Sequence, residues 1–246
     1  MEKSSIERVC MLAGKIMLVS GAETYRVEDT MGRIAAAYGA TNAQAYATPT
    51  AINFSINMES ETKFLRITKR STADLHKIAA VNSVSRQVTA GELNLENAYA
   101  QLKEVENEIL YSSWLQIIAA SFVSGCFAIM FGGTWEDFLP ALVAGGLGFA
   151  AMIGLERFLD IRFLAEFFGA FATGITSFLL LSNGIGASLD KIIIGGVMPL
   201  VPGLLITNAV RDLMSGHLIA GLSKGVEALL TAFAIGAGIA VIYAFM

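Results

Sequence analysis

Charged residues are scarce in this sequence and unevenly distributed. Only 15% of the 246 residues are Asp, Glu, Lys or Arg, whereas an ordinary soluble domain has about 25%. Of these 38 residues, 25 precede position 113 and 13 follow it. The formal net charge of −4 gives no basic surface for nucleic acid. The imbalance excludes one uniform soluble domain and predicts a polar domain at residues 1–112 followed by a membrane domain at 113–246.

Cysteine and histidine are nearly absent, with two of each in the whole chain. Cys10 and Cys126 cannot build a disulfide framework, and no cluster of cysteine and histidine has the spacing of metal ligands. We therefore expect no metal and no cofactor. The first ten residues, MEKSSIERVC, lack the charged segment and apolar core of a signal peptide. The polar domain is accordingly expected in the cytoplasm.

Long apolar runs, by contrast, fill the second half of the chain. Crossing a hydrocarbon core of about 30 Å takes roughly 17–25 apolar residues. Five runs reach that length, at residues 114–131, 138–155, 163–181, 192–210 and 228–246, and Glu166 is the one charged residue within them. The predicted fold class is an α-helical polytopic membrane protein with five transmembrane helices behind a small α+β cytoplasmic domain.

The predicted orientation comes from the positive residues between these runs. Arg157 and Arg162 follow the second run, and Arg211 and Lys224 follow the fourth, whereas Lys191 stands alone on the other side. Cytoplasmic loops carry the excess of Lys and Arg. We therefore expect a multi-pass protein of the cytoplasmic (inner) membrane, with its N-terminus in the cytoplasm and its C-terminus outside.

An odd number of spans in a short chain predicts that another membrane protein completes it. Small residues recur at four-residue spacing within the runs, at Ser121/Gly125, Ala170/Gly174 and Ala232/Gly236/Ala240. Such positions let helix backbones approach closely in lipid. They suit packing within the chain, and equally association with a second polytopic membrane subunit.

The polar domain shows helical and strand periodicity in turn. Its predicted order is α-α-β-β-α-α, with helices at 5–19, 21–39, 73–88 and 95–111 and strands at 50–57 and 62–68. Ser20 and Glu23 have the spacing of a capping box for the second helix. The fourth helix is expected to continue straight into the first transmembrane span.

Three segments resemble a known family. They are SGAETYRVEDTM at residues 20–31, ATPTAINFSI at 47–56 and GGVMPLVPG…TNAVRDLMSGHLIAG at 195–221. Together they resemble the threonine/serine exporter family, and in particular the short subunit of its split members. The resemblance implies an exporter of small amino acids that works as an antiporter driven by the proton motive force. It also implies a separately encoded membrane partner, while other members are linked to dicarboxylates such as succinate.

The fourth apolar run contains an expected break in its helix. Pro199 and Pro202 each remove a backbone donor, and Gly203 follows directly. A helix that restarts there would direct free N–H groups at a substrate carboxylate. Thr207 and Asn208, one turn further, could add hydrogen bonds. These five residues are the predicted substrate-binding set, with a simple proline kink and interhelical bonding as the alternatives.

Three residues are candidates for proton coupling: Asp212, Glu166 and His217. Asp212 follows the fourth run and is adjacent to Arg211. The alternative role for Arg211 is to extend its side chain towards the membrane surface. Glu166 is either a titrating carboxylate in the transport pathway or the partner of Arg162 in an i,i+4 ion pair. His217 could relay a proton or have no special role.

The family resemblance also marks the start of the second helix as a possible gate or cytoplasmic entry site. Its candidate residues are Glu23, Tyr25, Arg26 and Glu28, together with Arg211. The helix dipole alone would also favour acids at this position.

Two further functions compete with export. A membrane-anchored hydrolase needs a nucleophile beside a base, but Ser20, Thr24 and Thr48 have no histidine near them in sequence, and His76 is the one histidine of the polar domain. We therefore expect no catalytic residue. A regulatory subunit whose partner performs the transport is the other alternative.

Overall fold

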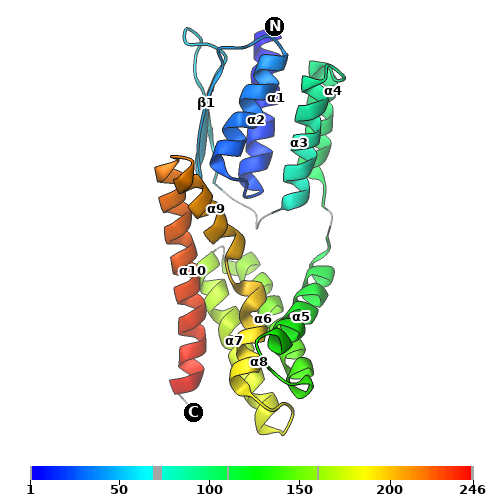
Figure 1. The fold of residues 1–246 in the computed structure, drawn as a ribbon, viewed down its shortest axis with the longest axis vertical. Coiled ribbons are helices and arrows are strands. Elements are labelled where there is room, and N and C mark those ends of the chain that lie inside the picture. The colour runs from blue at the N-terminus through cyan, green and yellow to red at the C-terminus, as the bar shows by residue number, and fades with distance from the viewer. Residues whose placement is uncertain (1, 69–73, 110, 160, 245–246) are drawn as a thin grey trace. The chain divides into compact units, whose positions relative to one another are not determined.

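The computed structural model describes residues 2–68, 74–109, 111–159 and 161–244 (Figure 1). The chain forms two compact units. Unit 1 combines Met1–Glu108 with Leu204–Val226, and unit 2 combines Ile109–Gly203 with Glu227–Met246. The sequence placed residues 204–226 with the membrane domain, whereas the structure packs them with the N-terminal residues.

Unit 1 is built around two N-terminal helices and a small sheet. Its elements are α1 Glu2–Val19, α2 Thr24–Ala37, β1 Gln44–Thr48, β2 Ala51–Ser55, β3 Lys63–Arg66, α3 Leu75–Thr89 and α4 Leu95–Asn107, joined by α9 Gly203–Met214 from Leu204 onward and by the first residues of α10 Leu218–Ala244. Met17, Met31, Ile34 and Phe54 are fully buried in its core. Their burial fixes which faces of α1, α2 and β2 point inward.

The sheet has one strand more than the sequence predicted. Its order is β1-β2-β3, and both neighbouring pairs are antiparallel. The predicted hairpin of two strands is confirmed as β2 and β3, but β1 was missed. The sequence of β1, QAYAT, is short and carries two alanines, so it lacks the large alternating residues that mark a strand.

The turn between α1 and α2 corrects the predicted capping box. Gly21 has a positive φ of 80°, its N–H donates to Leu18, and the Ala22 N–H donates to Met17. This is a Schellman motif, in which the glycine terminates the preceding helix. Ser20 therefore lies in the turn that follows α1 and does not cap α2. Helix α2 begins at Thr24, and the Glu23 side chain makes no capping hydrogen bond.

The chain also leaves the helical conformation between α4 and the next helix. Glu108 has an extended backbone, and α5 begins at Ser113 with the Ser112 hydroxyl accepting from the Leu115 N–H. The predicted continuous helix from residue 95 into the first span is therefore wrong, because the serine cap starts a new helix.

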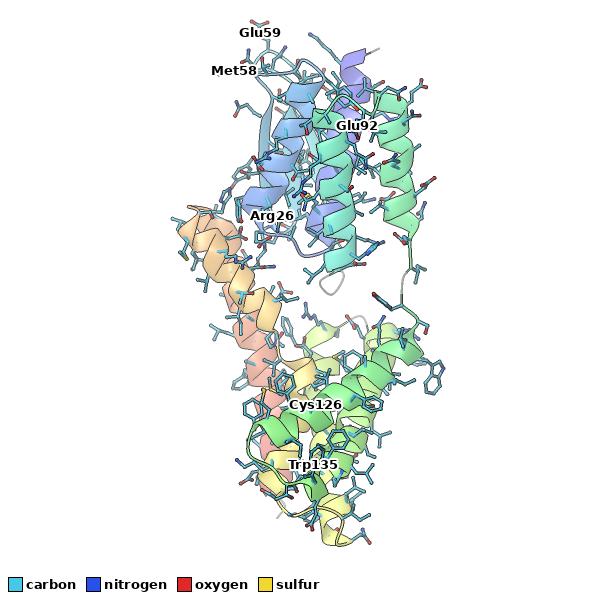
Figure 2. All side chains as sticks on the ribbon, turned by 45° about the vertical axis from the view of Figure 1, so that its right-hand side comes forward. Arg26, Met58, Glu59, Glu92, Cys126 and Trp135 are labelled. Carbon is cyan, nitrogen blue, oxygen red and sulfur yellow. The ribbon has the colours of Figure 1, made fainter. Side chains whose placement is uncertain are left out.

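Unit 2 consists of long apolar helices. They are α5 Ser113–Met130, α6 Trp135–Leu159, α7 Arg162–Ser182 and α8 Leu189–Val197, the 3₁₀ helix η1 Met198–Leu200, and α10 from Glu227. Outward side chains such as Trp135 and Cys126 (Figure 2) are exposed. Within the described residues, four helices (α5, α6, α7 and α10) are long and apolar enough to cross a membrane, and the bent pair of α8 with η1 and α9 makes up to five. The chain is thus a multi-pass membrane protein.

Glycines bring the helices of unit 2 into backbone contact. A Cβ atom on Gly195 of α8 would lie 2.7 Å from the Ser124 carbonyl oxygen and 2.7 Å from the Ala128 nitrogen of α5. Similarly, a Cβ on Gly148 of α6 would lie 2.8 Å from the Gly169 carbonyl oxygen of α7. The close approach explains how the helices pack without large interlocking side chains.

The Gly195→Ala substitution should destabilise unit 2. Because the added methyl group would meet backbone atoms that cannot rotate away, we expect a loss of about 1–3 kcal/mol, measured as a lower melting temperature of the purified chain in detergent. Gly236→Ala in α10 is the matched control, since a Cβ there meets nothing within 4 Å. An unchanged melting temperature for Gly195→Ala would contradict the backbone contact.

Candidate functional site

Polar side chains from distant parts of the chain meet inside unit 1. We call the group the α2–α9–α10 network and define it by Glu23, Thr24, Glu28, Asn208, Arg211, Asp212, His217 and Lys224. It joins residues of the first recognised segment, 20–31, to residues of the third and to Lys224, which follows it. Sequence separations of its contacts reach 202 residues. The network is therefore the place where the two most specific sequence segments come together.

A buried ion pair lies at the centre of the network. Asp212 of α9 is 0% exposed and Lys224 of α10 is 3% exposed, and Lys224 Nζ lies 2.7 Å from Asp212 Oδ2. Thr24 donates to the same carboxylate from its N–H at 2.8 Å and from its hydroxyl at 3.0 Å. Both carboxylate oxygens thus accept hydrogen bonds. One of the donors is the Thr24 N–H in the first turn of α2, which has no carbonyl partner within the helix. Negative charge is favoured at this end of a helix.

The side chains of Lys224 and Asn208 donate hydrogen bonds to carbonyl groups of the turn that follows α1. The Lys224 ammonium donates to the Ala22 carbonyl at 3.0 Å, and the Asn208 amide donates to the Gly21 carbonyl at 2.8 Å. The positive φ of Gly21 turns the chain after α1, so that these carbonyls are presented to α9 and α10. A backbone turn in the N-terminal region is thereby bonded directly to the helices of the third segment.

Glu23 forms the second ion pair of the network. Its carboxylate lies 2.6 Å from Arg211 Nη1 and 3.3 Å from Arg26 Nη1; Arg26 is labelled in Figure 2. Burial by itself would raise the pKa of Glu23. Hydrogen bonds from its own backbone N–H and from Arg211, with the charge of Arg26, outweigh burial and hold that pKa below its usual range. Glu23 is therefore a stable anion facing two guanidinium groups.

His217 and Glu28 form the third pair. His217 Nε2 lies 2.9 Å from Glu28 Oε2, and the other oxygen of Glu28 accepts from the Ala47 N–H of β1 at 2.8 Å. Gly216, with a φ of 83°, terminates α9 in the same Schellman geometry as Gly21, because the His217 N–H donates to the Asp212 carbonyl. His217 Nδ1 is buried without a hydrogen bond to the described residues.

The predicted gate residues are brought together only in part. Glu23, Arg26 and Arg211 contact one another, and Glu28 joins His217. Tyr25 is partly buried in the first turn of α2, and the structure gives it no distinctive contact in the network. Whether any of them is a gate stays a prediction.

The predicted helix break is confirmed. Helix α8 ends at Val197, Pro199 lies in η1, Val201 is extended with ψ 130°, and α9 restarts at Gly203. A residue before proline is forced away from helical backbone angles, so Pro202 accounts for the extended Val201.

The predicted substrate-binding set is divided between the two units. Pro199, Pro202 and Gly203 belong to unit 2, and Thr207 and Asn208 to unit 1. Thr207 donates to the Leu204 carbonyl at 3.0 Å, within its own helix. Asn208 is engaged with Gly21, a contact that no local pattern indicated.

Glu166 lies apart from the network, in unit 2. Its i,i+4 ion pair with Arg162 is present, with Arg162 Nε 2.9 Å from Glu166 Oε1. Arg162 also contacts Glu227 of α10 at 3.0 Å. Among the residues that the structure describes, no three His, Cys, Asp or Glu side chains gather as a metal site.

Lys224 is the functional candidate that sequence reasoning missed. It was counted with Arg211 as a loop charge, but the structure places both inside helices, Arg211 in α9 and Lys224 in α10. The usable signal was a lone lysine at the start of a long apolar helix, since such a residue requires a buried partner. The predicted orientation therefore depends chiefly on Arg157 and Arg162, and it stays a prediction.

Comparison with known proteins gives one family. Residues 8–246 match the family ThrE, described as "Putative threonine/serine exporter". The chain is 26% identical over 232 residues to the "Probable threonine/serine exporter" of Mycobacterium tuberculosis, covering 92% of this chain and 43% of that protein. It is 24% identical over 239 residues to the "Threonine/serine exporter" of Corynebacterium glutamicum, covering 92% and 48%.

A second group of relatives is named after a different substrate. The chain is 24% identical over 240 residues to the "Probable succinate transporter subunit YjjP" of Klebsiella aerogenes, covering 94% of this chain and 90% of that protein. The chain thus spans less than half of the two exporters and nine-tenths of the succinate transporter subunit. No solved structure matches it.

Proposed function

Because the chain belongs to the threonine/serine exporter family, we propose that it is one subunit of a secondary exporter of small carboxylated metabolites of the threonine/serine type. The family resemblance carried by the three sequence segments is thereby confirmed. The substrate, the partner and the coupling go beyond that membership.

The observation that carries the proposal is the buried ion pair of Lys224 and Asp212 at the centre of the α2–α9–α10 network. A free amino acid has one ammonium and one carboxylate group, and the buried pair of Lys224 and Asp212 offers one partner for each. The substrate carboxylate would bind Lys224 together with the Thr24 N–H, and the substrate ammonium would bind Asp212. The Lys224–Asp212 pair would thus be replaced by two ion pairs, one of each residue with the substrate. Every buried charge would keep a partner of opposite sign.

Succinate is the alternative substrate, and the relatives named succinate transporter subunit YjjP favour it. A dicarboxylate brings two negative charges and no ammonium group. Next to Asp212 it would leave buried carboxylates without cations, because Arg26 and Arg211 already face Glu23. The network therefore favours a zwitterion over a dianion.

The partner is proposed to be a second polytopic membrane subunit. The exporters from Mycobacterium and Corynebacterium are more than twice as long as the matched region, and YjjP is named as a subunit. Ala232, Gly236 and Ala240 of α10 are exposed small residues on the described chain, and a helix face of this kind allows close helix association in lipid. We further propose that export is antiport driven by the proton motive force, with the N-terminus in the cytoplasm.

The N-terminal domain is proposed to be part of the transport machinery. Thr24 and Glu23 at the start of α2 supply three of the four side-chain contacts of Asp212 and Arg211, and Lys224 supplies the fourth. A change in those contacts on substrate binding would move α9 and α10 against α2. The domain would thus act as a cytoplasmic entry or gate, and a hydrolytic role is not needed to explain it.

Efflux from proteoliposomes tests this function. The chain is purified with its membrane partner, and vesicles are loaded in turn with threonine, serine and succinate. We expect pH-gradient-dependent efflux of threonine and serine at a rate about tenfold or more above that of succinate, because only the amino acids pair with both Asp212 and Lys224. Faster efflux of succinate would reverse the substrate assignment, and efflux of none of the three would contradict the exporter.

A further inference from the structure

Glu166 is a buried carboxylate that is only half satisfied. The residue lies near the start of α7 and is 3% exposed. Its Oε1 accepts from Arg162 Nε at 2.9 Å. Its Oε2 is buried and makes no hydrogen bond of good geometry with any described group. Burial of an ionised oxygen without a donor is costly, so the site favours a state in which that oxygen carries a proton.

A hydroxyl group lies against the same carboxylate. Thr231 of α10 is 0% exposed, its Oγ1 also lacks a hydrogen bond of good geometry, and it faces Glu166. A hydroxyl can donate to an ionised carboxylate or accept from a protonated one. Thr231 can therefore serve Glu166 in both protonation states without a movement of the helix.

One guanidinium group is shared between two carboxylates at this site. Arg162 contacts Glu166 through Nε and Glu227 of α10 through Nη1, at 2.9 and 3.0 Å. The negative charge of a third carboxylate, Glu156 of α6, repels the charge on Glu166. Two acids that share one cation favour uptake of a proton by one of them, and Glu166 is the acid with the unsatisfied buried oxygen.

We propose that Glu166 binds the coupling proton of the exporter, and that the proton controls how Arg162 is shared between Glu166 and Glu227. The inference rests on the proposed function, which requires a coupling ion. A proton from water forms an O–H bond at Glu166 Oε2, and the same bond breaks when the proton leaves to water on the other side. Arg162 stays charged throughout and turns from the neutralised Glu166 towards Glu227.

The helix packing explains how this local change is transmitted. Helices α7 and α10 approach so closely that a Cβ on Gly238 would lie 2.4 Å from the Phe167 carbonyl oxygen, and a Cβ on Gly174 would lie 2.9 Å from Ile242. At Gly238 the two backbones meet directly, and at Gly174 the Ile242 side chain packs against the backbone of α7. A shift of Arg162 from an acid of α7 to an acid of α10 therefore changes the force between two helices in direct contact.

A proton fits the site better than a metal cation. Hard cations such as calcium or magnesium take about six oxygen ligands, whereas Glu166 Oε2 and Thr231 Oγ1 are the two orphaned oxygens here. In the described ranges, no three His, Cys, Asp or Glu side chains are arranged so that they could hold a metal ion. A proton needs a single acceptor oxygen and a hydrogen-bond partner, which is what the two residues provide.

Infrared spectroscopy tests proton binding directly. The purified complex in lipid is titrated with acid and base, and the carbonyl stretch of protonated carboxylic acids is followed. We expect a band in the wild type that disappears as the pH rises, that is lost in Glu166→Gln and that persists in Glu136→Gln, an exposed acid at the start of α6. An unchanged band in Glu166→Gln would overturn the proposal.

Transport tests coupling. In proteoliposomes, Glu166→Gln should retain threonine–threonine exchange at a rate that no longer depends on pH, while efflux driven by a pH gradient falls by about tenfold or more. Glu136→Gln should match the wild type in both assays. Gradient-driven efflux at the wild-type rate in Glu166→Gln would overturn the proposal.

A second variant covers a Glu166→Gln chain that fails to fold. The Glu227→Gln substitution keeps Glu166 and removes the second carboxylate that shares Arg162. Arg162 then stabilises the ionised form of Glu166 more strongly, so the pH dependence of efflux should move to lower pH. An unmoved pH profile would count against the sharing of Arg162. If wild-type vesicles transport no threonine at all, the proposed function fails, while the infrared comparison still decides whether Glu166 binds the proton.

Discussion

Replacing Asp212 with asparagine should both stop threonine efflux and destabilise the chain. Lys224 is 3% exposed and would lose the carboxylate that lies 2.7 Å from its ammonium nitrogen. Breaking a buried ion pair by removing one partner costs about 3–5 kcal/mol. The expected measurements are a large fall in melting temperature in detergent and loss of efflux from proteoliposomes.

A double substitution separates the two effects. In Asp212→Asn with Lys224→Met, no buried charge is left unpaired, and replacement of a whole buried pair is often neutral for stability. We therefore expect the melting temperature to return towards that of the wild type while efflux stays lost. Asp29→Asn is the matched control, because the ion pair of Asp29 with Arg33 is exposed and should contribute about 0–1 kcal/mol. Wild-type efflux in the double variant would contradict a role of the pair in binding.

The Pro202→Ala substitution should produce the second large effect. Pro202 holds Val201 in an extended conformation and separates η1 from α9. Without the proline ring, the residues between Val197 and Gly203 can continue the helix, since alanine is the best helix former. We expect efflux to fall by about a hundredfold, because a continuous helix would change the direction of α9, which carries Asn208, Arg211 and Asp212 of the network.

Pro199 supplies the control for that experiment. It lies at the start of η1, a position where its missing N–H has no intrahelical partner to lose. Pro199→Ala should therefore retain most of the efflux, and both variants should melt within a few degrees of the wild type. Equal loss in the two variants, or none in either, would contradict the assignment of the break to Pro202.

Local rules explain what could be predicted from the sequence. The break depends on Pro202 and the residue before it, and the Arg162–Glu166 pair depends on i,i+4 spacing, so both were visible within a few residues. The capping box failed because Ser20 and Glu23 match its spacing while Gly21 between them ends α1. Ser20 could have served as the N-cap of α2, but the left-handed backbone of Gly21 places Ser20 in the turn after α1 instead.

The network could not be predicted, because its contacts join residues far apart in the sequence. Thr24 and Asp212 are separated by 188 residues, and neither periodicity nor spacing carries that information. The sequence also assigned Lys224 to a loop by counting charges, which cannot distinguish a solvated lysine from a buried one. Only the fold shows that its ammonium is paired with Asp212 and bonded to the end of α1.

The bonds from Asn208 and Lys224 to the carbonyls of Gly21 and Ala22 affect the order of events during synthesis. The ribosome makes α1 and α2 first, but the partners of these carbonyls follow 187 and 202 residues later. The N-terminal region therefore leaves the ribosome with its turn uncapped and with Glu23 lacking Arg211. Its final packing must wait until α9 and α10 have been made, so helices that follow most of the spans complete the turn after α1.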